Sequence, residues 1–225
     1  MLLDQLSLLT AIAFSAVALI VTLFVGWLGA RRDSFLLNWS LGLVLVVLGV
    51  ISYGMLVDAY STNLHMAAFT PTLLGFAFIY AGSRQFCGRP LPYMALAVLT
   101  AVLIGLMVIP SLTGWSGVGA IFANLGLALF MAMSGAEYWR SRAEAPVPMV
   151  ANAGLYGVAA ISFALCSAVL VANGDWVLTS RPENWAEELN AIVAIVGLTG
   201  IGAISLTLNQ SRLTRHHRDQ ARTDS

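Results

Sequence analysis

The chain has 225 residues and no net charge, with 59% hydrophobic residues, 10% charged residues and a mean hydropathy of +0.83. A soluble domain carries about 25% charged residues, so this chain lacks the polar side chains that would cover a folded unit in water. All 11 basic residues are arginines, and the absence of lysine excludes functions that need one, such as a retinal Schiff base.

Apolar runs follow one another along the chain, each close to the length of about 20 residues that crosses a bilayer as a helix. Because backbone polar groups must be paired within the hydrocarbon region, each run is expected to be helical. The predicted spans are Leu6–Ala30, Phe35–Val57, Leu64–Ser83, Leu91–Ile109, Gly117–Tyr138, Met149–Val171 and Leu189–Leu208. We therefore predict an all-α, polytopic membrane protein, a seven-transmembrane helical bundle over residues 1–208.

The arginines test this count and give the bundle an orientation. With seven spans and an external N-terminus, every arginine except Arg181 falls on the cytoplasmic side, as the positive-inside rule requires. These arginines are Arg31, Arg32, Arg84, Arg89, Arg140, Arg142, Arg212, Arg215, Arg218 and Arg222. The pattern predicts an external N-terminus and a cytoplasmic C-terminus.

Similar short motifs precede three of the predicted cytoplasmic loops. Gly29, Gly82 and Gly135 are evenly spaced (82 − 29 = 135 − 82 = 53) within W-L-G-A-R-R, Y-A-G-S-R-Q and M-S-G-A-E-Y. The spacing favours three helical hairpins joined on the cytoplasmic side and followed by a solitary seventh helix. Chance recurrence of small residues before arginine-bearing loops explains it equally well.

The sequence contains no recognisable catalytic, metal-ligand or phosphate-binding motif. Ionisable groups inside a membrane usually mark ion paths or catalysis, yet Asp58 and Glu137 lie at span ends and His65 lies at the outer end of the third span. We therefore predict no catalytic residue, no metal site and no cofactor in this chain.

Polar side chains within or near the spans are the remaining candidates for a binding site. Asn124 is the deepest of them. The ordinary role of such an asparagine is an interhelical hydrogen bond, worth about 0.6–2 kcal/mol. The alternative is that some of these side chains line a pocket for a small or amphiphilic ligand. The residues predicted to line such a pocket are Asn124, Asn38, Tyr53, Asn190 and Trp185.

The segment Ala172–Glu188 is the one sizeable external connection that the predicted spans leave. It carries the acidic residues Asp175, Glu183, Glu187 and Glu188 and the tryptophans Trp176 and Trp185. Such a segment either covers an outward-facing pocket as a lid or, more commonly, lies at the membrane surface with its tryptophans among the lipid head groups.

Residues 209–225 form a basic tail without glycine or proline, compatible with a helix that continues the seventh span. A 3-4 spacing through Leu206, Asn209, Leu213 and His216 predicts a cytoplasmic signalling helix. Few of the positions in this seam are apolar, so it is weak as a coiled coil. The alternative is a basic flank that stops transfer of the chain across the membrane.

A multi-span region followed by a charged helix that ends in A-R-T-D-S resembles the N-terminal sensor region of bacterial GGDEF-type diguanylate cyclases. In that family the helix leading into the catalytic domain ends in a D-x-L-T-G-L-type motif, whose first two positions Asp224 and Ser225 would occupy. The patterns W-x-L-G and A-G-x-R-x-F-x-G-R-P in the apolar region also resemble those of these sensor regions. The L-T-G-L and GGDEF motifs are not in this chain, so no catalytic residue is carried over.

The resemblance implies a sensory input domain that regulates a cytoplasmic output domain, a diguanylate cyclase making cyclic di-GMP. It also implies a homodimer through the C-terminal helix, with no nucleic-acid partner. A function of another class stays open, a stand-alone small transporter or lipid-interacting membrane protein. The reading frame beyond Ser225 would distinguish the two.

Overall fold

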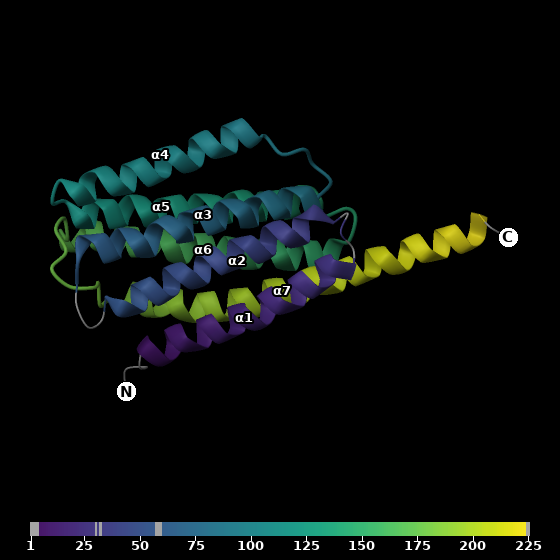
Figure 1. Cartoon of the computed structure of the whole chain (residues 1–225), viewed down its shortest axis with the longest axis horizontal. Helices are drawn as coiled ribbons and strands as arrows, with labels where there is room; N and C mark the ends of the chain where they lie inside the picture. Colours follow the sequence, from purple (N-terminus) through teal and green to yellow (C-terminus); the bar gives the residue numbers. More distant parts are fainter. Residues whose placement is uncertain (1–4, 30, 32, 57–59, 224–225) are drawn as a thin grey trace.

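The described part of the chain consists of seven α-helices without a β-strand (Figure 1). The computed structural model describes residues 5–29, 31, 33–56 and 60–223, with side chains for 7, 9–29, 31, 33–56 and 60–208. The helices are α1 (Gln5–Gly29), α2 (Ser34–Met55), α3 (Thr62–Phe86), α4 (Tyr93–Leu112), α5 (Ser116–Arg140), α6 (Pro146–Asn173) and α7 (Trp185–Thr223). All seven are long and apolar enough to cross a membrane, which confirms the all-α class and indicates an integral membrane protein.

Successive helices reverse direction along the long axis of the bundle, so their connections gather at two ends (Figure 1). One end, here called the arginine end, holds the α1–α2, α3–α4 and α5–α6 connections. The other, called the loop end, holds the α2–α3, α4–α5 and α6–α7 connections. Helix α1 begins at the loop end, and α7 extends well beyond the arginine end.

Six of the helices close a ring around the interior of the protein. Each helix packs against the next in the order α1, α2, α3, α5, α6 and α7, and α7 returns to α1. Helix α4 lies outside this ring against α3 and α5. Helices α2 and α3, which are joined at the loop end, form the most extensive of these contacts, followed by α5 and α6, one of the hairpins predicted at the arginine end. The predicted α3–α4 hairpin has the least extensive contact of the helix pairs that pack together.

Helices α2 and α3 pack closely because small residues face each other along their contact. A Cβ atom added to Gly42 would lie 2.7 Å from the carbonyl oxygen of Gly75, and one added to Gly49 would lie 2.6 Å from that of Ala68. Small residues let transmembrane backbones approach in this way. One turn after Gly49, Tyr53 is held against α3, its ring edge-on to Phe69 at 6.0 Å.

Helix α7 begins at Trp185, earlier than the predicted Leu189. The side-chain oxygen Oδ1 of Asn184 accepts hydrogen bonds from the backbone N–H groups of Ala186 (3.0 Å) and Glu187 (3.1 Å), which is how asparagine caps a helix N-terminus. Glu187 therefore lies in the first turn of α7 and not in the preceding loop.

At its other end α7 continues as a single helix of 39 residues to Thr223, which confirms the predicted unbroken helix. Leu206 is partly buried. The side chains of Asn209, Leu213 and His216 lie outside those that the structure describes, so the predicted seam stays a prediction.

Candidate functional site

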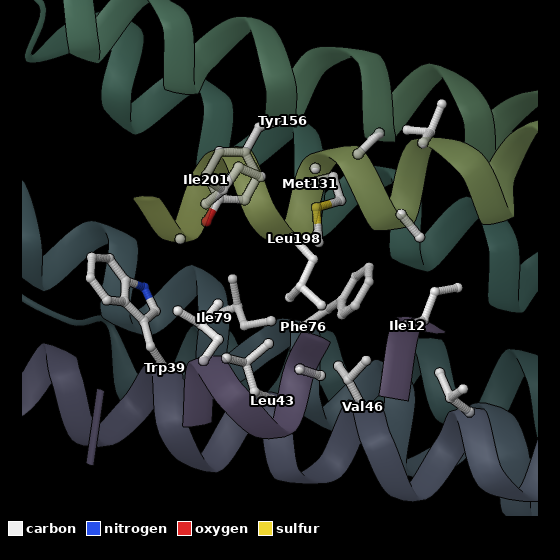
Figure 2. A pocket seen from close by; sticks show the side chains of 18 of the residues that line it. Ile12, Trp39, Leu43, Val46, Phe76, Ile79, Met131, Tyr156, Leu198 and Ile201 are labelled. Carbon is white, nitrogen blue, oxygen red and sulfur yellow. The ribbon is translucent and has the colours of Figure 1, made fainter. Parts of the chain in front are cut away.

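The ring of helices forms two adjoining chambers that are partly open to the surface. The first, called the apolar chamber, has a volume of about 130 Å³ and is walled by side chains such as Leu43, Phe76 and Met131 (Figure 2). The second, called the polar chamber, has a volume of about 140 Å³ and lies toward the loop end. Both chambers share the wall residues Ile12, Val46, Val50, Phe76, Phe163, Asn190 and Ala194.

Helix α7 forms one wall along the whole length of the apolar chamber. Its lining residues run from Asn190 to Ser205, a distance of about 22 Å at a rise of 1.5 Å per residue. Leu198 and Ile201 of α7 face Trp39 and Leu43 of α2 across the chamber in Figure 2. The cavity is therefore elongated, and it is apolar along most of its length.

A cluster of polar side chains lies at the loop end of the cavity. The hydroxyl of Tyr53 donates a hydrogen bond of 3.2 Å to Oε2 of Glu187. The guanidinium carbon Cζ of Arg181 lies 5.7 Å from the centre of the Tyr53 ring, within range of a cation–π interaction. All three residues line the polar chamber, so a cation, a carboxyl group and a phenol meet there.

Arg181 is the least satisfied member of this cluster. It is only 6% exposed, and its Nε and Nη1 atoms are buried without a hydrogen-bond acceptor among the described residues. Its Nη2 atom lies 3.9 Å from Oε1 of Glu183, whose side chain is exposed. Arginine does not lose its charge in proteins, and a buried charge without partners is costly.

The α6–α7 loop holds Arg181 in place by docking on the first turn of α5. The carbonyl oxygen of Trp176 accepts a hydrogen bond of 3.0 Å from the N–H of Gly117. The hydroxyl oxygen of Ser116 accepts one of 2.9 Å from the N–H of Leu178. Trp176 and Trp185 remain exposed, so the loop places an arginine over the cavity while its tryptophans face outward.

The structure brings three of the five predicted pocket residues to one chamber. Asn124, Tyr53 and Asn190 all line the polar chamber. Oδ1 of Asn190 accepts a hydrogen bond of 2.8 Å from the hydroxyl of Ser162. Asn124 is buried, and no hydrogen bond joins its side chain to another described residue.

The other two predicted residues lie elsewhere. Asn38 is at the arginine end, where its Nδ2 donates a hydrogen bond of 2.7 Å to Oε1 of Gln85 on α3. This is the interhelical hydrogen bond expected as the ordinary role of such an asparagine. Trp185 is 58% exposed and lines neither chamber.

Arg181 and Glu187 were not predicted as pocket residues, although the sequence contains a signal for each. Arg181 is the one arginine that the predicted topology places outside. Asn184 followed by Glu187 has the spacing of a helix N-terminus. Once α7 starts at Trp185, Glu187 shares a helix face with Asn190 and Ala194, which lie three and seven residues further on.

A second charged cluster lies at the arginine end. Glu137 is 2% exposed, and its carboxylate oxygens lie 2.8 Å from Nη1 of Arg84 and 3.0 Å from Nη1 of Arg89. Nε of Arg84 also donates a hydrogen bond to the carbonyl oxygen of Pro90. This cluster ties α3, the α3–α4 connection and α5 together, so it serves as an internal brace. Arg84 and Glu137 occupy matching positions in the 53-residue spacing found in the sequence (137 − 84 = 53).

Neither a protein-family model nor a curated protein nor a solved structure matches this chain. Within the described ranges, no group of three or more histidine, cysteine, aspartate or glutamate side chains has an arrangement that could hold a metal ion. The site is therefore defined by its geometry, an elongated apolar cavity that ends at a buried arginine with two nitrogen atoms, Nε and Nη1, that lack a hydrogen-bond acceptor among the described residues.

Proposed function

We propose that this chain is a membrane-embedded sensory domain that binds an apolar or amphiphilic ligand in its cavity and relays binding through α7. The observation that carries this proposal is that the same helix lines the cavity and projects from the bundle. Helix α7 walls the cavity from Asn190 to Ser205 and then continues without a break to Thr223, beyond the bundle (Figure 1). A ligand that favours one packing of α7 shifts the projecting part with it.

In this proposal the arginine end faces the cytoplasm and the loop end faces outward. The distribution of arginines supports that orientation, since positive residues are retained on the cytoplasmic side. The cavity then opens its polar chamber toward the outside of a bacterial inner membrane, and α7 delivers its C-terminal part into the cytoplasm.

The output that we propose is a diguanylate cyclase, which would act as a dimer. This part rests only on the resemblance of the sequence to the sensor region of that family. A pair of α7 helices in contact through Leu206, Asn209, Leu213 and His216 would have polar residues at core positions. Such a seam leaves two registers close in energy, which is the bistable element that a switch requires.

Crosslinking of α7 in native membranes tests the proposal. A Leu213→Cys variant is oxidised in membranes and scored for crosslinked dimer, with the parent chain as background because both native cysteines are buried. Ala194→Trp fills the cavity wall, whereas Ala203→Trp adds the same side chain at an exposed position of α7. We expect a dimer whose yield changes with Ala194→Trp and not with Ala203→Trp.

Two results would contradict the sensor proposal. The absence of any crosslinked dimer would make the tail a basic membrane flank. A dimer whose yield ignores both tryptophans would show that the cavity and the projecting helix are not coupled.

A further inference from the structure

The buried guanidinium of Arg181 identifies the kind of head group that the cavity accepts. Two of its nitrogen atoms, Nε and Nη1, point to no acceptor among the described residues, and the side chain lines the polar chamber. Guanidinium groups are best satisfied by the oxygens of carboxylates and phosphates. An occupant that brings such oxygens into the chamber would supply the acceptors that the protein does not.

The neighbouring Glu187 does not fill this role. The buried carboxylate of Glu187 interacts with the charge of Arg181, but it accepts no hydrogen bond from the guanidinium, and its Oε2 accepts the hydroxyl hydrogen of Tyr53 at 3.2 Å. Glu183 approaches Arg181 from the solvent side only, at 3.9 Å with an exposed side chain. The N–H groups on Nε and Nη1 of Arg181 therefore have no acceptor from either glutamate.

The adjoining apolar chamber identifies the rest of the ligand. It extends for about 22 Å along α7 between side chains such as Leu43, Phe76 and Leu198, and Figure 2 shows these side chains converging on the cavity. Such a chamber suits an unbranched alkyl chain, because an apolar chain packs against these side chains and brings in no polar group that would be left without a hydrogen bond. The shape is long and narrow, with one charged end.

We propose that the cavity binds a single-chain anionic amphiphile of the fatty-acid class, with its carboxylate on Arg181 and its alkyl chain in the apolar chamber. Asn124 and Asn190 line the chamber beside the head group as further polar contacts. This inference specifies the ligand of the proposed sensor and rests on that function only for its biological meaning, since binding can be measured without any output.

Equilibrium binding of tritiated dodecanoate to the full chain in phosphatidylcholine nanodiscs tests the assignment. We expect saturable binding, with affinity reduced about tenfold to a hundredfold in Arg181→Gln, since a hydrogen bond to a charged group contributes about 1.5–3 kcal/mol. Arg181→Lys keeps the positive charge but lacks the planar guanidinium. Its affinity for dodecanoate should lie between those of the parent chain and Arg181→Gln. Arg142→Gln is the matched control, because Arg142 is exposed at the opposite end.

Competing compounds test each half of the ligand. Methyl dodecanoate, which lacks the charge, and dodecylamine, which reverses it, should compete at least about tenfold more weakly than dodecanoate. Nanodiscs containing phosphatidylglycerol distinguish the source of the head group. If they abolish dodecanoate binding, the site takes the phosphate of an anionic lipid and the fatty-acid assignment is wrong. Ala194→Trp, which narrows both chambers, should reduce binding even if Arg181 variants fold poorly.

Several results would overturn the proposal. These are the absence of saturable dodecanoate binding, equal affinity in Arg181→Gln, or stronger competition by dodecylamine, which would make Glu187 the head-group ligand. The sensor proposal has a separate outcome. If dodecanoate does not bind but the crosslinking of Leu213→Cys still responds to Ala194→Trp, the sensory role is supported and the fatty-acid assignment is wrong. If dodecanoate binds without altering that crosslinking, the ligand assignment is supported and the signalling role is wrong.

Discussion

The two ends of the bundle each bury a charged side chain, but they treat it in opposite ways. At the arginine end, Glu137 is 2% exposed and lies within 3.0 Å of two arginines. At the loop end, Arg181 is 6% exposed and keeps two nitrogen atoms without an acceptor among the described residues. Both charges are hidden from water, yet only Glu137 has charged partners within hydrogen-bond distance, whereas the nearest carboxylate oxygen paired with Arg181 lies 3.9 Å away on Glu183.

This difference separates a structural group from a binding group. A buried carboxylate held by two guanidinium groups stabilises the native packing, and its loss leaves those groups unpaired. A buried guanidinium without acceptors weakens the protein that carries it. Such strain persists in natural proteins chiefly at functional sites, where a ligand relieves it. The contrast therefore points to the loop end as the place where binding occurs.

The largest expected effect concerns the sides of the membrane on which the two ends lie. Reporter fusions after Arg32, Arg89, Arg142 and Arg222 should read as cytoplasmic, and fusions near Ser61, Gly114 and Asn184 should read as external, because the arginines are retained inside. The outcome is all-or-none at each site. One inverted reading would break the seven-span topology and with it the assignment of Arg181 to the outside.

Removal of the paired charge should have the next largest effect. Glu137→Gln leaves Arg84 and Arg89 without their carboxylate, and we expect a loss of stability of up to about 3 kcal/mol, measured as a lower thermal midpoint in detergent. Arg142→Gln, at the same end but outside this cluster, should have little effect. In the double variant Glu137→Gln/Arg84→Gln the losses should be clearly less than additive. Additive losses would mean that the brace does not act as a unit.

Removal of the arginine whose donors lack acceptors should not cause such a loss. Arg181→Met keeps the unbranched apolar stem of the side chain and deletes the donors that lack acceptors, so we expect stability to be unchanged or raised by up to about 2 kcal/mol. The same thermal measurement without added amphiphile provides the test. A loss as large as that of Glu137→Gln would show that Arg181 is a structural group and that the contrast between the two ends is false.

The fold was predictable from sequence because it depends on composition and length. Apolar runs of bilayer length predict helices whatever their neighbours are, and the observed α2 and α5 start within a residue of the predicted Phe35 and Gly117. The site depends on long-range packing instead. Asn124 and Tyr53 lie on different helices, and only the assembled ring shows that they face one chamber and that Asn38 does not.

The residues that were missed show where sequence reasoning stops. Glu187 was assigned to a loop because the apolar run begins at Leu189, whereas the cap at Asn184 extends the helix toward the surface. Arg181 was noted only as an exception to a charge rule. Its burial depends on the docking of the α6–α7 loop on Ser116, a contact between residues that are far apart in the sequence.

The smallest expected effect compares two buried or partly buried amides that were both predicted to line a pocket, Asn124 and Asn38. Asn38 donates a hydrogen bond of 2.7 Å to Gln85 on the neighbouring helix, while Asn124 lines the polar chamber without a hydrogen bond to another described residue. Asn38→Leu should therefore lower stability by about 0.6–2 kcal/mol. Asn124→Leu should change stability by less, because no bond to the protein is lost.

Binding should rank the two amides in the reverse order. Asn124→Leu places an apolar side chain beside the head group proposed to sit on Arg181, so the affinity for dodecanoate should fall severalfold, whereas Asn38→Leu should leave it unchanged. Thermal midpoints and binding curves measured on the same two preparations make the comparison internal. If Asn124→Leu lowers stability as much as Asn38→Leu and leaves binding intact, then Asn124 is a packing residue like Asn38. The polar chamber would then lose one of the side chains assigned to its ligand, and the charge of Arg181 alone would have to select the head group.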